Sequence, residues 1–484
     1  MNRKMIGKML GILLLLECLF LFPPAMISAF RGEDRALMGI FSSMLLCSGA
    51  GALFWFLCRK AERRFYAREG FLIVALGWIL LSAAGALPFW LSGEIPHYVD
   101  AFFEVVSGFT TTGSSILTNV EAMSHGLIFW RSFTHWLGGM GILVFLLAVV
   151  PMGGGGYSVH LLRAESPGPS VGRLVPKVRQ TAAILYLIYV VLTILCVCFL
   201  LLGKMSLFDS LCTAFGTAGT GGFGIKNDSM AGYSPYLQNV CTVFMAIFGI
   251  NFNIYFLILT GKFRQAIRSE ELAAYLGIML GAMALITVNI LPQYSGRVGA
   301  AFHDAAFSVS SIMTTTGFST ANFDLWPQLS RSILVVLMII GASAGSTGGG
   351  IKCIRVVLVC KSMRAYLRQS LHPRSINPVR AEGHVVSPET LHGVSVFLSA
   401  YSAIAILSFL LLSLDNFSLE TNLTAVLSCL NNIGPGLDKV GPAGNFSMFS
   451  DLSKLVLSLD MLLGRLEIFP ILILFSPRTW QRAT

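Results

Sequence analysis

The feature that most constrains this chain is the recurrence of apolar stretches near or above the roughly 20 residues needed to cross a bilayer. They lie at about 9–30, 36–58, 71–92, 127–151, 181–203, 237–260, 272–292, 331–361, 393–414 and 452–476. Of the 484 residues, 55% are hydrophobic and only 12% are charged, which is too apolar for an ordinary soluble core. The sequence therefore predicts an all-α integral membrane protein with ten candidate spans, whose apolar surface faces the lipid bilayer.

Lys and Arg gather in alternate connections between these stretches. If the N-terminus is cytoplasmic, the even-numbered connections lie inside, where basic residues are expected to accumulate. The basic segments are the N-terminal tail, residues 59–68, 163–179 and 262–268, the long loop after 352, and the C-terminal end. Topology thus explains the net charge of +10 without a nucleic-acid partner. We expect a multi-pass protein with cytoplasmic N- and C-termini.

Four short segments between the spans end in Thr and Gly, and they form an internal repeat. In three of them an Asp precedes a Gly by 13 residues: Asp100 and Gly113, Asp209 and Gly222, Asp304 and Gly317. In the fourth copy position 423 is Leu, and Glu420 lies three residues earlier, so this copy has drifted. Each segment lies between two apolar stretches. The repeated unit is therefore a span, a short helix, a Gly-rich loop and a second span.

This unit divides the chain into regions. We expect four pseudo-repeated helix, pore-loop, helix units around a central cation pore, with two additional transmembrane helices at the N-terminus. The additional helices occupy residues 1–60, followed by repeat 1 at 70–152, repeat 2 at 180–262, repeat 3 with a broken last helix at 271–361, a cytoplasmic loop at 362–392, and repeat 4 at 393–476.

The repeated segments have the composition of a cation filter. About ten residues cannot cross a membrane, so each segment should enter from the outer face and return, with its acidic residue at the start of the short helix. The Thr and Gly residues that follow can aim backbone carbonyls at a common axis, where they would bind a cation. One such cluster could be a plain turn, but four in matched register favour a filter. The candidates are Thr111, Thr112, Gly113, Thr220, Gly221, Gly222, Thr315, Thr316, Gly317, Asn432, Ile433, Gly434 and Gly436.

A glycine-rich stretch at 341–350 interrupts the long span after the third loop. Each glycine weakens a helix by about 1 kcal/mol relative to alanine, so we expect a break that serves as a gate. The alternative is that the span ends at 341 and a plain loop follows. Arg465 lies inside the last span, where a charge is costly. It could restrain the glycine-rich loop, form an electrostatic barrier, or pair locally with Glu467 or another carboxylate. The candidate gate residues are Gly345, Ser346, Thr347, Gly348, Gly349, Gly350, Lys352 and Arg465.

These motifs resemble those of the TrkH/KtrB/HKT superfamily of cation transporters over nearly the whole chain. The matching segments are Thr-Thr-Thr-Gly at 110–113, Thr-Gly-Gly-Phe at 220–223, Thr-Thr-Gly-Phe at 315–318, Asn-Ile-Gly-Pro-Gly at 432–436, Gly-Ser-Thr-Gly-Gly-Gly-Ile-Lys at 345–352 and Gly-Arg-Leu-Glu at 464–467. The two additional spans are similar to the TrkH branch. The resemblance implies a bacterial inner-membrane homodimer, with one pore per subunit, on a cytoplasmic ring of nucleotide-binding TrkA-type subunits. It also implies that Gly113 favours K⁺.

The expected function is potassium uptake, with K⁺ as the transported ion and no cofactor on this chain. A relaxed pathway for both Na⁺ and K⁺ is the alternative within the same class. A membrane-embedded enzyme or sensor would need His or carboxylate clusters in mid-membrane or a catalytic domain outside it, and residues 362–392 have too few apolar residues for a core. We therefore do not expect an enzyme.

Overall fold

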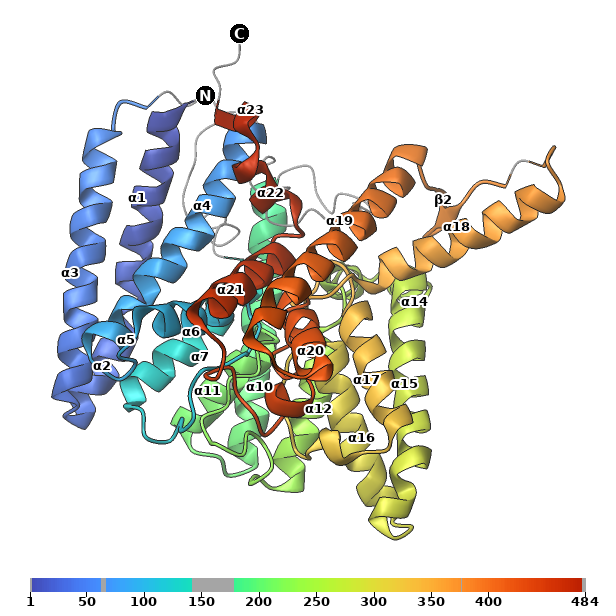
Figure 1. The fold of residues 1–484 in the computed structure, drawn as a ribbon, viewed down its shortest axis with the longest axis horizontal. Coiled ribbons are helices and arrows are strands. Elements are labelled where there is room, and N and C mark those ends of the chain that lie inside the picture. The colour runs from blue at the N-terminus through green and yellow to red at the C-terminus, as the bar shows by residue number, and fades with distance from the viewer. Residues whose placement is uncertain (1, 62–66, 142–177, 376, 481–484) are drawn as a thin grey trace.

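The computed structural model describes residues 2–61, 67–141, 178–375 and 377–480, and these residues are mostly helical (Figure 1). Six helical segments within them are long and apolar enough to cross a membrane. They are Arg3–Arg31 (α1 Arg3–Phe20 with α2 Phe22–Arg31), α3 (Asp34–Leu57), Arg68–Leu91 (α4 Ala67–Gly85 with α5 Leu87–Leu91), Ala182–Leu202 in α10 (Val178–Leu202), Glu270–Tyr294 (α15 Glu270–Ile290 with η1 Leu291–Tyr294), and Pro388–Asp415 (α19 Pro388–Leu412 with η3 Ser413–Asp415). The chain is therefore a multi-pass membrane protein.

The N-terminal helices α1 and α3 lie at one edge of the molecule, beside α4 of repeat 1 (Figure 1). Their backbones approach closely because Gly11 faces Gly51, and a Cβ on Gly11 would lie 2.9 Å from the Gly51 carbonyl oxygen. Close contact through small residues is typical of helix packing in lipid. On the opposite side, α3 exposes Phe41, Leu45 and Leu46. This apolar face suits contact with lipid.

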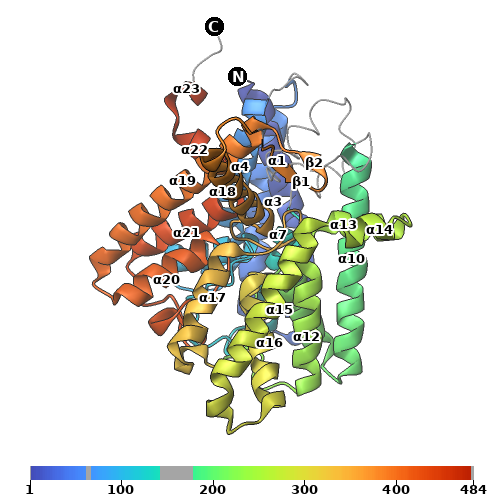
Figure 2. The ribbon, with the colours of Figure 1, turned by 90° about the vertical axis from the view of Figure 1, so that its right-hand side faces the viewer.

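Each repeat contributes a short helix that is buried in the middle of the bundle. These helices, here called pore helices, are α6 (Tyr98–Phe109), α11 (Leu207–Ala218), α16 (Val298–Met313) and α20 (Leu419–Leu430). Their C-terminal halves are almost fully buried, whereas their N-terminal turns are partly exposed. The long helices surround them (Figures 1 and 2).

The helix that follows each pore loop is too short to span the membrane alone. These second helices are α7 (His125–Gly139), α12 (Pro235–Phe248), α17 (Gln328–Ile340) and α21 (Asp451–Arg465). Each has 13 to 15 residues, which gives about 20 Å at 1.5 Å per residue, against about 30 Å of hydrocarbon. The spans expected at 237–260 and 452–476 are therefore interrupted, contrary to expectation, whereas the span at 331–361 is interrupted at 341–352, where a break was expected. Residues 142–151 of the span at 127–151 lie outside the described residues.

The interruptions have local causes. After α12 the chain turns at Gly249, and α13 (Phe252–Leu259) leaves at 87°. After α17 a non-helical segment, residues 341–352, precedes α18 (Cys353–Leu371). After α21, Glu467 and Ile468 take φ values of 53° and 73°, and α22 (Phe469–Phe475) begins with a proline in its first turn. Left-handed backbone and an N-terminal proline both end the preceding helix.

Two further expectations need correction. Asp100, Asp209 and Glu420 do lie in the first turn of their pore helices, but Asp304 lies in the interior of α16, because this helix begins already at Val298. Its carboxylate accepts hydrogen bonds from the hydroxyls of Tyr294 and Thr320.

The region at 362–392 is not simply a loop. Helix α18 continues to Leu371 and extends away from the bundle (Figure 1), and a small antiparallel hairpin follows, with β1 (Arg380–Ala381) paired to β2 (His384–Val385). The remaining described helices are the short segments α14 (Phe263–Ile267) and α23 (Pro477–Trp480), with one-turn helices η2 (Phe323–Leu325) and η4 (Asp438–Val440).

Candidate functional site

The four pore helices end in the same hydrogen-bonded turn. In the first, the Thr111 N–H donates to the Gly108 carbonyl and the Thr112 N–H donates to the Ser107 carbonyl, at 3.1 and 2.9 Å. This pair of bonds is a Schellman motif. The same pair recurs at Thr220 to Thr217 and Gly221 to Gly216, at Thr315 to Ile312 and Thr316 to Ser311, and at Asn432 to Cys429 and Ile433 to Ser428. The repeat inferred from sequence is therefore a repeat of backbone conformation.

Each turn contains a left-handed residue followed, two positions later, by a left-handed glycine. The first residues are Thr111, Thr220, Thr315 and Asn432, with φ between 53° and 60°, and the glycines are Gly113, Gly222, Gly317 and Gly434, with φ between 75° and 104°. A β-branched residue rarely adopts positive φ, and such strain tends to occur at functional sites. The fourth copy, although drifted in sequence, adopts the same conformation, which aligns Asn432 with Thr111.

The four loops close into a ring. A Cβ added to Gly113 would collide with the Gly221 carbonyl oxygen, one on Gly222 with that of Thr316, and one on Gly317 with that of Ile433. A Cβ on Gly434 would lie 2.8 Å from the Thr112 carbonyl oxygen. The fourth loop therefore contacts the first, and the ring is closed. The carbonyls of Thr112, Gly221, Thr316 and Ile433 thus occupy equivalent positions. We call these four carbonyls the carbonyl ring.

Gly436 lies outside this ring, contrary to expectation. Its N–H donates to the Val440 carbonyl at 2.7 Å, and a Cβ there would approach the Thr424 hydroxyl, behind the loop. Gly436 therefore supports the outer loop.

A cavity of about 120 Å³ lies next to the ring. The glycines Gly113, Gly222, Gly317 and Gly434 line its floor, and Arg131 and Lys226 contribute basic groups. Within the described residues, no cluster of three or more His, Cys, Asp or Glu side chains could hold a metal ion.

The segment 341–352, here called the gating loop, is packed against the inner side of the third and fourth loops. The Gly349 N–H donates to the Thr315 hydroxyl at 2.6 Å, and a Cβ on Gly349 would collide with the Asn431 carbonyl oxygen. On the side of repeat 2, the Ser343 N–H donates to the Gly249 carbonyl at 3.1 Å. The segment is therefore a tightly packed insertion and differs from the plain loop that was the alternative.

Arg465 joins the gating loop to repeat 1. Its guanidinium donates to the carbonyl of Thr347 at 2.8 Å, to that of Gly139 at 2.7 Å, and to that of Gly138. Glu467 forms an ion pair with Arg355 of α18. Among the alternatives for Arg465, contact with the glycine-rich loop is therefore the one that the geometry favours.

The other predicted gate residues lie within the gating loop. Lys352 has a φ of 81°, and its ammonium donates to the Gly348 carbonyl, which closes the loop on itself. Gly345 accepts the Phe252 N–H at 2.9 Å, and Ser346 donates to the Ser343 carbonyl at 2.6 Å. Gly350, with a φ of 78°, lies against Gly341 at the base of the loop.

Sequence reasoning missed one gating-loop contact entirely. The carboxylate of Glu271 accepts the Ala344 N–H at 2.6 Å and a bond from the Asn251 amide at 3.2 Å. In the sequence Glu271 looks like one of two acidic residues that open a helix, so nothing distinguishes it.

Arg131 was also missed, although it could have been found. It lies within the apolar stretch 127–151, and a charged residue inside a membrane-spanning segment is costly, as it is for Arg465. Its Nε donates to Glu104 at 2.6 Å, close to the first two loops. His135, on the same helix, forms an interhelical hydrogen bond: its Nδ1 lies 2.8 Å from the Gly108 carbonyl oxygen.

Comparison with known proteins places this architecture. The model of the TrkH family, described as cation transport protein, matches residues 36–482. The Trk system potassium uptake protein TrkH of Escherichia coli K12 is 34% identical, over 99% of this chain and 100% of the relative, and TrkG of the same organism is 31% identical over 99% of each. The crystal structure of the potassium transporter TrkH from Vibrio parahaemolyticus superimposes with a TM-score of 0.89 at 32% identity, covering 99% of this chain and 100% of that one. The chain belongs to the TrkH family of cation transport proteins.

Proposed function

We propose that this chain takes up potassium ions through a pore whose selectivity filter is the carbonyl ring. The observation that carries the proposal is the closed set of contacts among the four loops, which brings the carbonyls of Thr112, Gly221, Thr316 and Ile433 together. Such a ring replaces part of a cation's hydration shell. The relatives named as potassium uptake proteins support K⁺ as the transported ion.

The gating loop would close the pathway on the inner side of the ring. Its backbone N–H groups donate hydrogen bonds to Thr315 and Glu271, and its Thr347 carbonyl accepts one from Arg465, so three different parts of the bundle hold it. Conduction would require this segment to move away from the third and fourth loops. Glycine at positions 345 and 348–350 suits a backbone with two arrangements, because it permits conformations that other residues resist.

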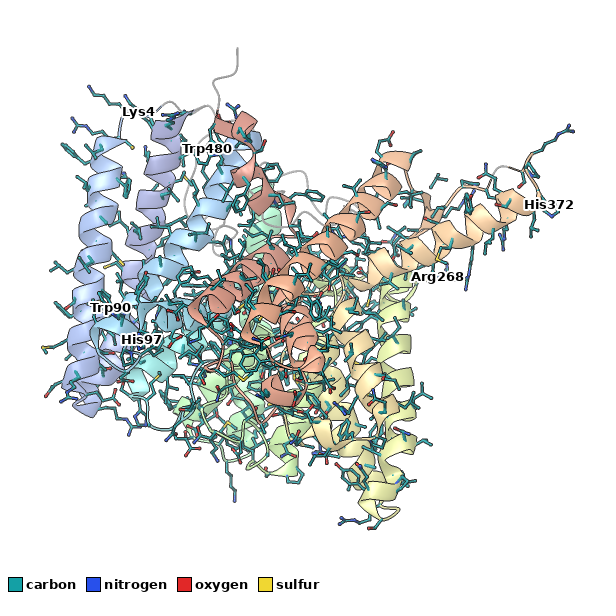
Figure 3. All side chains as sticks on the ribbon, in the orientation of Figure 1. Lys4, Trp90, His97, Arg268, His372 and Trp480 are labelled. Carbon is teal, nitrogen blue, oxygen red and sulfur yellow. The ribbon has the colours of Figure 1, made fainter. Side chains whose placement is uncertain are left out.

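The protein is proposed to lie in the bacterial inner membrane with both termini in the cytoplasm. Lys4 and Trp480 lie at the same end of the molecule, whereas Trp90 and His97 lie farther from it (Figure 3). Basic residues are expected on the cytoplasmic side. We further propose a homodimer on a cytoplasmic ring of TrkA-type nucleotide-binding subunits, which the extended helix α18 and the Trk system names of the relatives support.

The test is ion flux into liposomes that contain the purified protein. With opposed K⁺ and Na⁺ gradients and Rb⁺ as tracer, we expect uptake of K⁺ and Rb⁺ and exclusion of Na⁺. Equal uptake of Na⁺ and K⁺ would replace the proposal with a relaxed monovalent-cation pathway. If neither the protein alone nor the protein with its cytoplasmic partner shows flux, the pore assignment is wrong.

A further inference from the structure

Helix α7 carries polar residues at two buried positions that are apolar in its three counterparts. Arg131 is the seventh residue of α7 and His135 the eleventh. The seventh residues of α12, α17 and α21 are Cys241, Leu334 and Leu457, and the eleventh are Met245, Met338 and Met461. Arg131 is 3% exposed and His135 is 0% exposed. Burying such groups is unfavourable unless they are fully hydrogen-bonded, so their contacts identify their role.

The guanidinium of Arg131 links the first pore helix to the second loop. Its Nε donates to Glu104 of α6 at 2.6 Å, and its Nη1 donates to the Gly224 carbonyl at 2.9 Å. The group also lies over the Phe223 ring, 3.5 Å from the ring centroid. Phe223 and Gly224 directly follow Gly222 of the ring. One side chain thus contacts the backbone that leaves the second loop.

Glu104 holds the backbone that leaves the first loop. Its carboxylate accepts the Ile116 N–H at 2.9 Å and the Ser115 hydroxyl at 2.9 Å. Bonds to an ionised carboxylate are about twice as strong as those between neutral groups. Together, Glu104 and Arg131 connect residues just outside Gly113 to residues just outside Gly222.

His135 acts one helical turn deeper, between the same two loops. The Phe223 N–H donates to its Nε2 at 3.3 Å, which makes Nε2 the acceptor and leaves Nδ1 to donate to the Gly108 carbonyl at 2.8 Å. A Cβ on Gly221 would collide with the imidazole ring. The first and third loops have Thr112 and Thr316 where the second has Gly221. The second loop therefore carries glycine because His135 occupies the space of a side chain.

We propose that Glu104, Arg131 and His135 form a brace that determines ion selectivity. They are positioning residues: they fix the spacing between the Thr112 and Gly221 carbonyls without themselves contacting the ion. This inference rests on the proposed function, since it concerns which ion the carbonyl ring accepts. At the positions equivalent to Arg131 and His135, the other described second helices carry apolar residues, so this brace belongs to the junction of loops 1 and 2.

The test replaces the charged pair in the intact protein with neutral residues, as the double variant Arg131→Met with Glu104→Gln. Removing both charges avoids leaving one buried alone, which would destabilise the fold. In liposomes we expect the ratio of Rb⁺ to Na⁺ uptake to fall by about tenfold, the scale of one lost charge-assisted hydrogen bond. The thermal midpoint of the purified protein is measured in parallel.

The matched control is Arg331→Met with Glu420→Gln. This pair joins α17 to α20 near the outer surface and contacts none of the ring carbonyls. Because this pair is partly exposed, we expect the control to lose less thermal stability than the brace variant and to keep the wild-type ion ratio. A brace variant that is destabilised but keeps the wild-type ratio would overturn the inference.

A second variant covers the case in which the double variant does not fold. Arg131→Lys keeps the charge opposite Glu104 but cannot form the planar pair of bonds to Glu104 and Gly224. We expect a smaller fall in the same ratio, and an unchanged ratio in the folded variant contradicts the brace. Failure of the wild-type protein to take up K⁺ would instead count against the proposed function.

Discussion

The carbonyl ring is held in two different ways on its two sides. Loops 1 and 2 are tied together by Arg131, His135 and Glu104, which are side chains anchored within helices. Loop 3 is contacted from the inner side by the gating loop, whose Gly349 N–H donates to Thr315. The same repeated turn is thus braced by fixed side chains at one junction and by a glycine-rich backbone segment at another. This difference suggests that selectivity and gating are separable by mutation.

The largest change in ion selectivity should come from a substitution in the carbonyl ring itself. In Gly113→Ser, the new Cβ would collide with the Gly221 carbonyl at a φ of +84°, so the ring must open at that junction. We expect the K⁺ over Na⁺ uptake ratio to fall by more than about tenfold, because a displaced carbonyl no longer replaces hydration water.

Gly93→Ser is the control for that change. Gly93 also has a positive φ, of 79°, but a Cβ there would meet nothing within 4 Å. It therefore carries the same backbone strain without the ring contact, and its ion ratio should equal that of the wild type. If Gly113→Ser leaves selectivity unaltered, the filter assignment is incorrect.

Removing the Arg465 side chain should free the gating loop and raise basal flux without changing ion selectivity. In Arg465→Ala, the gating loop loses its bond to Thr347, and the carbonyls of Gly138 and Gly139 lose a donor. We expect basal Rb⁺ flux to rise by about tenfold with an unchanged K⁺ to Na⁺ ratio, consistent with the loss of a bond to a charged group. Arg364→Ala, in the exposed part of α18, serves as control. A selectivity change in the Arg465 variant would show that the two functions are not separable.

Thr315→Val tests the hydrogen bond between the gating loop and the third pore loop, and it removes only one hydroxyl group. The valine has nearly the same shape, but the buried Gly349 N–H loses its acceptor at 2.6 Å. An unsatisfied buried donor costs about 1–3 kcal/mol, so the closed arrangement should weaken and basal flux should rise several-fold. In the control Thr242→Val, the hydroxyl removed bonds only to Gln238 within its own helix. Equal flux in the two variants would exclude this contact from gating.

Glu271→Gln should have the smallest effect. Glutamine retains an acceptor for the Ala344 N–H but loses the charge that strengthens the present 2.6 Å bond. We expect about a twofold rise in basal flux, measured as initial Rb⁺ uptake, and no change in the ion ratio. A fall in flux would instead mean that Glu271 stabilises the open arrangement.

Much of this architecture follows from the sequence. The apolar stretches indicated the membrane class, and the spacing of Asp and Gly indicated three of the four pore loops. The fourth loop could be recognised only through Gly434, since Glu420 is out of register. Its conformation matches the others because the left-handed positions can be filled by Asn432 and Gly434. Backbone geometry is thus preserved where side-chain identity is not.

The breaks after α12 and α21 could not be read from hydropathy, whereas the glycines at 341–350 indicated the break after α17. A hydropathy window sums apolar residues across an interruption, so Glu467 and Ile468 appear as part of one span although their positive φ values end the helix. Long-range contacts were equally hidden. Glu271 lies 73 residues from Ala344, and Arg465 lies 326 from Gly139, and no local pattern relates residues so far apart.

The most direct test of the central claim is to locate the ion itself. Crystals of the protein grown with Rb⁺ in place of K⁺ would reveal bound ions by anomalous diffraction. The account predicts a peak on the axis of the carbonyl ring, within coordinating distance of the oxygens of Thr112, Gly221, Thr316 and Ile433. A well-ordered ring without a peak, or Rb⁺ bound only elsewhere along the pathway, would contradict it.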